Sequence, residues 1–120
     1  MRESGILMHI SSLYGDYSCG SFGKSAFEFC NSLKIVYIRN SLKVISERGF
    51  YGCSALETVA IGNGIKSIGN YAFAWCESLD SIKLSNALTA IPEHAFQGSY
   101  NLKSIEIPNS VKTIGRSAFE

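Results

Sequence analysis

The stretch Ile105–Phe119 reads IEIPNSVKTIGRSAF, and its arrangement of residue types recurs with a 23-residue period towards the N-terminus. Phenylalanine marks the period without a gap, at Phe27, Phe50, Phe73, Phe96 and Phe119. A small residue precedes each one, at Ala26, Gly49, Ala72, Ala95 and Ala118. Because a fixed period of this length is the signature of a repeat architecture, we predict a stack of similar units.

Further columns with the same spacing describe the secondary structure of one unit. A leucine follows six residues after each of the first four phenylalanines, and apolar columns and an asparagine column come next. The asparagines are Asn40, Asn63, Asn86 and Asn109. The last four residues of Leu102–Ile107 alternate apolar and polar residues, and Val111–Ile114 has two polar residues between apolar ones, so we predict two short strands joined by an asparagine corner. Gly115–Phe119 is predicted to form one helical or 3₁₀ turn.

A unit of this length buries its apolar side chains only by stacking on its neighbours, so strands of successive units are expected to pair in parallel. We therefore predict a leucine-rich repeat solenoid, a right-handed coil of short parallel strands, turns and short helical segments. Residues 33–120 hold the tandem repeats, the last one truncated. Residues 1–32 are interpreted as a degenerate capping repeat, in which counting back by one period places Ile10 in the leucine column.

The chain resembles the BspA-like leucine-rich repeats of bacterial and protist surface proteins. Their pattern is approximately I-x-I-P-x-S-V-x-x-I-G-x-x-A-F-x-x-C-x-x-L, which Ile105–Phe119 matches closely and Trp75–Leu79 completes as WCESL. The resemblance covers residues 20–120 well and residues 1–19 weakly. It implies a surface or secreted location and adhesion or contact with host proteins. The first residues do not show the apolar core expected of a secretory signal.

The composition and motifs of the chain argue against nucleic-acid binding, membrane spanning and catalysis. A net charge of +1 offers no clustered basic face for nucleic acid. The longest apolar run, Gly5–Met8, is far shorter than the ~20 residues that span a membrane. The sequence contains no P-loop, no dinucleotide-binding glycine motif and no His-Glu-x-x-His motif. We therefore expect no enzyme, no cofactor and no metal.

The cysteines are expected to lie in the core. Cys30, Cys53 and Cys76 share a column with Ser99, and exchange between cysteine and serine is typical of a small buried position. Stacked strands lie about 4.8 Å apart, whereas a disulfide joins Cβ atoms about 3.8 Å apart. Cys19 falls in an apolar column as well. Metal binding or redox use of this column is the less favoured alternative.

The outward positions of the first strands form the first candidate binding surface. Tyr37 and Arg39 belong to residue types enriched at interface hot spots, and Ile35 adds apolar area. Lys83 and Glu106 occupy the column of Tyr37 in later repeats. The alternative is an ordinary solvated face.

Phe29 and Trp75 form the second candidate. They alternate in one column with Gly52 and Gly98, so two large aromatic side chains stand two repeats apart, roughly 10 Å by strand spacing. Such a pair suits a clamp on a ligand or, equally, local packing back over Gly52.

Two kinds of partner suit such a scaffold. The first is an unidentified protein or peptide on a lateral face. The second is another copy of the chain, because sheet edges and open solenoid ends favour end-to-end pairing. The strand predicted at Leu102–Ile107 is such an edge. The predicted function is therefore protein binding, with a self-associating fragment of a longer surface solenoid as the alternative.

Overall fold

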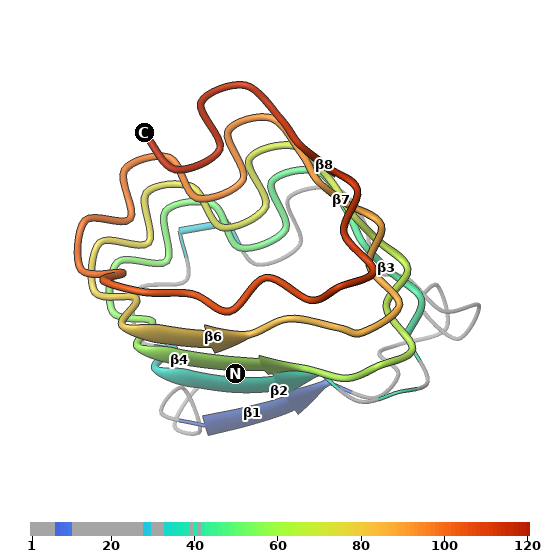
Figure 1. Ribbon diagram of the computed structural model, residues 1–120. Helices are drawn as coiled ribbons and strands as arrows, with labels where there is room; N and C mark the ends of the chain where they lie inside the picture. Colours follow the sequence, from blue (N-terminus) through green and yellow to red (C-terminus); the bar gives the residue numbers. More distant parts are fainter. Residues whose placement is uncertain (1–6, 11–27, 30–32, 39, 41) are drawn as a thin grey trace.

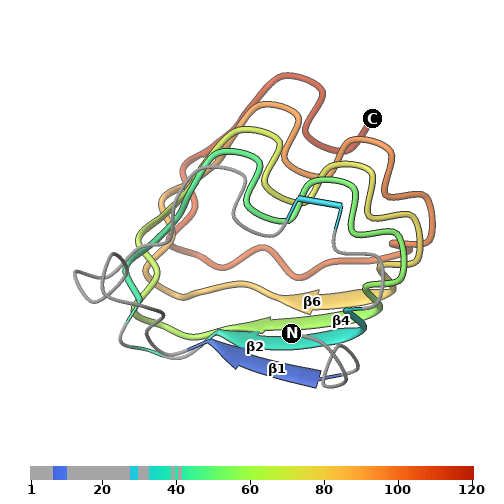
Figure 2. The same ribbon diagram turned by 180° about the vertical axis from the view of Figure 1, so that it is seen from behind.

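The chain folds into a solenoid whose coils each have a strand side, a second strand side and a turn side (Figures 1 and 2). This computed structural model describes residues 7–10, 28–29, 33–38, 40 and 42–120. One sheet contains β1 (Leu7–Ile10), β2 (Ile35–Ile38), β4 (Thr58–Ile61) and β6 (Ser81–Lys83), in that order. Two smaller sheets pair β3 (Val44–Ile45) with β5 (Ser67–Ile68) and β7 (Ala90–Ile91) with β8 (Thr113–Ile114). All these pairs are parallel, as the solenoid prediction requires.

The register confirms the 23-residue period between β2 and β6. Val36 pairs with Val59, and Val59 pairs with Ile82. We number the repeats accordingly as the first (33–55), second (56–78), third (79–101) and fourth (102–120). The predicted core columns are buried, with Leu33, Leu56 and Leu79 at 0% exposure.

The N-terminal strand departs from that period, and the alignment of Ile10 with the leucine column is wrong. Ile10 pairs with Ile38 and Leu7 with Ile35, so the offset between β1 and β2 exceeds one period. This register aligns Met8 and Ile10 with Val36 and Ile38, which are the buried positions of β2. Simple counting fails because the connection that follows β1 is longer than those of the later repeats.

Among the described residues the turn side contains turns but no helix, so the expected helical or 3₁₀ turn is not confirmed. In the first repeat it consists of successive tight turns, closed by bonds from Gly49 N to Ser46 O and from Tyr51 N to Arg48 O. Arg48 and Gly52 have φ of 58° and 71°. Left-handed residues four positions apart interrupt right-handed helical winding.

The two prolines of the chain coincide with breaks in the strand ladders. Gly69 and Gly115 donate backbone hydrogen bonds to Ile45 O and Ile91 O, whereas Pro92, which occupies the same column, has no N–H. β5 and β7 accordingly belong to separate small sheets.

The strand predicted at Leu102–Ile107 is not formed, which corrects the expected sheet edge. The large sheet ends at β6, and residues 102–107 run beside it without being part of it (Figure 1). Gly62 N donates to Ile38 O at 2.7 Å, but Pro108 in that column has no N–H to donate.

Candidate functional site

The strand face, defined as the outward side of β2, β4 and β6, places Tyr37, Ala60 and Lys83 in one row across three repeats. Tyr37 is 41% exposed, and Lys83 is also exposed. Because Ala60 is much shorter than its two neighbours, it forms the floor of a hollow of about 250 Å³ between them. A small residue between two long ones in adjacent repeats is the sequence signal for such a hollow.

The other predicted residues of this face are less well gathered. Ile35 is half-buried and contributes less apolar surface than expected. Glu106 is exposed but lies on the segment beyond β6, outside the sheet. Arg39 lies outside the described residues.

A ladder of asparagines borders the hollow and is built by hydrogen bonds between repeats. Asn63 N donates to Asn40 Oδ1 at 2.8 Å, and Asn86 N donates to Asn63 Oδ1 at 3.0 Å. Each of these side-chain oxygens therefore caps the corner of the next repeat. The asparagine column holds the corners in register and so fixes the edge of the strand face.

On the turn side, each of the two candidate aromatic rings lies against a glycine of the following repeat. A Cβ atom built on Gly52 would lie 2.6 Å from the ring of Phe29, and one built on Gly98 would lie 2.4 Å from the ring of Trp75. Both aromatic residues have positive φ, as both glycines do. Phe29 stays 59% exposed, whereas Trp75 is half-buried and its ring contacts that of Tyr100 edge-on.

Further aromatic contacts link the repeats along the turn side. Tyr71 and His94 stack with ring centroids 4.6 Å apart. Arg48 lies over the ring of Tyr51 at 3.9 Å and forms an ion pair with Glu28. The hydrogen bond to Glu28 raises the pKa of Arg48. These side chains therefore contact one another across successive repeats of the turn side.

The described cysteines lie in the core, as predicted. Cys53 and Cys76 are not in a disulfide and are at 0% exposure, and Cys76 Sγ donates to Phe50 O at 3.2 Å. Ser99 continues the column by donating from Oγ to Phe73 O at 2.8 Å. Desolvation by burial, with a smaller contribution from Cys53, raises the pKa of Cys76. The thiol is therefore neutral near pH 7 and a poor nucleophile. Cys19 and Cys30 lie outside the described residues.

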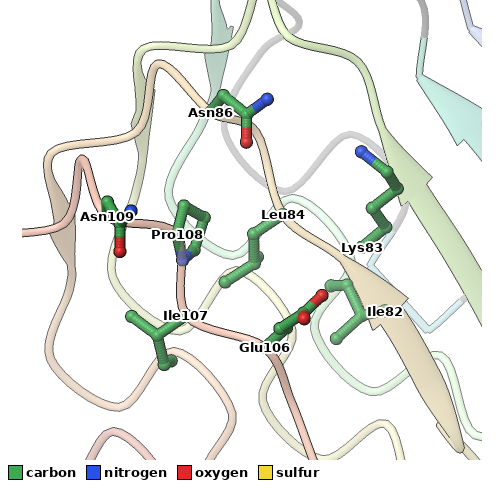
Figure 3. Close-up of a pocket in the computed structure, with 8 residues that line it drawn as sticks. All are labelled: Ile82, Lys83, Leu84, Asn86, Glu106, Ile107, Pro108 and Asn109. Carbon is green, nitrogen blue, oxygen red and sulfur yellow. The ribbon is translucent and has the colours of Figure 1, made fainter.

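The gap between β6 and the fourth repeat is a further concave site, which the sequence did not predict. It holds a cavity of about 400 Å³ (Figure 3). Ile82, Lys83 and Leu84 form one wall, and Glu106, Ile107 and Pro108 form the other. A second cavity of about 590 Å³ continues between Ser81 and Ser104.

Within the described part of the chain, no three histidine, cysteine or acidic side chains come together in a way that would hold a metal ion. The same residues include no helix of the length and apolar character needed to cross a membrane.

The repeat geometry agrees with the similarity to known proteins. The family model described as "BspA type leucine rich repeat region" matches residues 8–120 in six copies. The chain belongs to this family. A BspA-type repeat is a scaffold module.

Solved structures of bacterial leucine-rich repeat proteins share the fold. A protein from Eubacterium ventriosum is 28% identical with a TM-score of 0.82, over 93% of this chain and 30% of that one. One from Bacteroides ovatus is 29% identical with a TM-score of 0.67, over 90% of this chain and 33% of that one. A leucine-rich cell surface protein from Faecalibacterium prausnitzii is 23% identical with a TM-score of 0.50, over 95% of this chain and 44% of that one. The chain thus spans about a third of the first two.

A short stretch of 32 residues is 62% identical to a 4-alpha-glucanotransferase of Streptococcus pneumoniae. It amounts to 27% of this chain and 6% of that enzyme. A match of this length does not carry an activity to the chain.

Proposed function

We propose that this BspA-type scaffold binds a protein partner through its strand face, in a role of adhesion or host contact. The observation that carries the proposal is the hollow over Ala60, which lies between the exposed side chains of Tyr37 and Lys83. An aromatic wall opposite a cationic one accommodates a partner side chain that is apolar at its base and acidic or carbonyl-bearing at its tip. The similar protein from Faecalibacterium prausnitzii is a cell surface protein, a location that permits contact with a host protein.

The rigidity of the strand face favours this function over an ordinary solvated surface. Val36, Val59 and Ile82 anchor its strands from below with at most 8% exposure. The asparagine ladder fixes its edge. A surface that is already ordered loses little entropy when a partner binds, and more of the contact energy is retained as affinity.

Binding to an immobilised panel of extracellular matrix proteins, measured by biolayer interferometry, tests the proposal. Replacing both Tyr37→Ala and Arg39→Ala is expected to weaken binding by roughly tenfold or more, as loss of hot-spot side chains does. Lys43→Ala is the matched control, since Lys43 is exposed but precedes β3 on another side of the coil. Equal affinity of the double variant and the control would move the site away from the strand face.

We also propose self-association as a second candidate function, because the fourth repeat exposes apolar side chains whose counterparts are buried. Ile114 and Phe119 are 54% and 45% exposed, whereas Ile91 and Phe96 in the third repeat are 2% exposed. Covering such side chains with a second copy removes apolar surface from water.

Light scattering after size exclusion, over a concentration series, tests this candidate. The mean mass is expected to rise with concentration, and Ile114→Lys is expected to return it to the monomer value because a charge would be buried in the contact. Lys112→Ala, which alters an exposed polar residue of the same segment, is the control. A monomer at every concentration would exclude the second candidate.

A further inference from the structure

β6 presents an unpaired backbone edge towards the fourth repeat. Among the described strands, its neighbour in the sheet is β4 alone. On that side Ser81 N donates to Glu57 O at 3.2 Å. Because successive residues of a strand direct their N–H and C=O groups to opposite sides, those of Ile82 face the gap. No strand of the described residues pairs with this edge.

The opposite wall of the gap, residues 104–107, has the alternating sequence of a strand, but its apolar side chains are less buried than those of the strands in the earlier repeats. Ile107 is 36% exposed, whereas Ile38, Ile61 and Leu84 in the same column are at most 3% exposed. Ile105 is only half-buried, although Val59 in its column is at 1%. The side chains of the fourth repeat in these columns are therefore more exposed than their counterparts in the earlier repeats.

Pro108 removes one backbone donor from the wall of the gap. At the equivalent position of the second repeat, Gly62 N ties the end of β4 to Ile38 O at 2.7 Å. Pro108 has no N–H with which to form the corresponding bond to Leu84 O. The fourth repeat therefore lacks one of the bonds that would draw it onto the outer edge of β6.

We propose that the gap between β6 and residues 104–107 accepts an extended peptide segment, which adds as a parallel strand to β6. The walls are two extended stretches of chain, so the cavities of about 400 and 590 Å³ lie along the direction of a strand. The free backbone groups of β6 are donors and acceptors that an extended polypeptide satisfies. The partner segment has apolar residues at alternate positions, where they meet Ile82 and Ile105, and polar residues between them beside Lys83 and Glu106.

This site adjoins the hollow on the strand face, because Lys83 borders both, but it does not include the aromatic wall of that hollow. Tyr37 does not line the gap, so Tyr37→Ala is expected to leave peptide addition unchanged even if it abolishes binding to a matrix protein. Failure of the strand-face proposal would therefore leave this inference standing, and the reverse also holds.

The test uses a fluorescein-labelled synthetic peptide with the sequence of residues 56–63, LETVAIGN, because β6 already pairs with this segment along its other edge. Fluorescence anisotropy on the full chain is expected to show saturable binding. The same peptide with alternate backbone nitrogens methylated keeps its side chains but loses its donors, and it is expected to bind at least about tenfold more weakly. NMR amide exchange is expected to slow at Ile82 when the unmethylated peptide is added.

Pro108→Gly supplies the matched protein variant. It restores the missing donor, so the fourth repeat is expected to close on β6, slow the exchange of the Ile82 amide without peptide, and reduce peptide affinity by at least about tenfold. Circular dichroism checks its fold, and the methylated peptide tests the proposal even if this variant unfolds. Absence of saturable binding, equal binding of the methylated peptide, or protection confined to Tyr37 and Ala60 would each overturn the inference.

Discussion

Phe73→Ala is expected to lower the free energy of unfolding by about 3–5 kcal/mol, the usual cost of removing a buried phenylalanine side chain. The ring is at 0% exposure in the second repeat. It stacks on Phe50 with centroids 5.2 Å apart and an interplanar angle of 5°, and on Phe96 at 5.8 Å and 8°. Alanine would therefore leave a void between two rings that cannot approach each other without moving whole repeats.

The effect is large because the stability of a solenoid is close to a sum of repeat and interface contributions. A natural domain has a total of about 5–15 kcal/mol, so the loss removes a large share of it. Urea unfolding followed by circular dichroism measures the change, and we expect a lower midpoint together with a shallower slope. The shallower slope follows if the repeats on the two sides of the void unfold separately.

Phe119→Ala is the matched control because it removes the same side chain from the same column. Phe119 is 45% exposed and stacks on Phe96, at 5.4 Å. Its truncation is expected to cost about half as much, since less apolar area is lost from the core. Equal losses from the two substitutions, or an unchanged midpoint for Phe73→Ala, would contradict the core assignment of this column.

The regular part of the fold could be predicted because each apolar column has one structural cause. Val36, Val59 and Ile82 recur once per period since they pair directly in the sheet, and the asparagines recur because each caps the next corner. The period therefore determines the parallel strands and the buried columns. Counting back by 23 residues misaligned β1 with β2, because the connection between these two strands is longer than the connections in the later repeats.

The conformation of the turn side and the absence of a strand at residues 102–107 could not be predicted, for different reasons. Positive φ is usually signalled by glycine or asparagine, but the left-handed residues here include Arg48, Tyr71 and His94. Their conformation is imposed by bonds between repeats, such as Arg48 N to Asn70 O at 3.0 Å. The last four residues of the segment 102–107 have the alternation of a strand, yet alternation does not indicate whether a neighbouring strand edge is within reach.

The candidate sites also differ in whether the repeat pattern predicts them. Exposure of Tyr37 and Lys83 followed from alternation along the strands, so both could be named from the sequence. The hollow over Ala60 depends on the relative lengths of three side chains from different repeats. The gap beside β6 depends on a pairing that does not form. Neither can be seen within a single repeat.

Gly98→Ala is expected to destabilise the chain by about 1–3 kcal/mol, the range for forcing extra volume into a packed site. The new methyl group would lie 2.4 Å from Trp75 Cε3 and 2.5 Å from Cδ2, which are ring atoms attached to a rigid frame. Tyr100 contacts the same ring edge-on at 5.9 Å and limits its retreat. Thermal unfolding followed by circular dichroism measures the loss.

A double-mutant cycle separates the clash from the backbone strain at Gly98, where φ is +75°. With Trp75→Ala already present, the methyl group meets no ring, and Gly98→Ala should then cost only the left-handed strain of about 1–2 kcal/mol. A positive coupling between the two sites would show that a large aromatic side chain in one repeat requires glycine in the next. Phe29 and Gly52 provide a second pair for the same cycle, because a methyl group added at Gly52 would lie 2.6 Å from the ring. Additive losses at both pairs would mean that the alternation of aromatic residues and glycines in this column is not a packing rule.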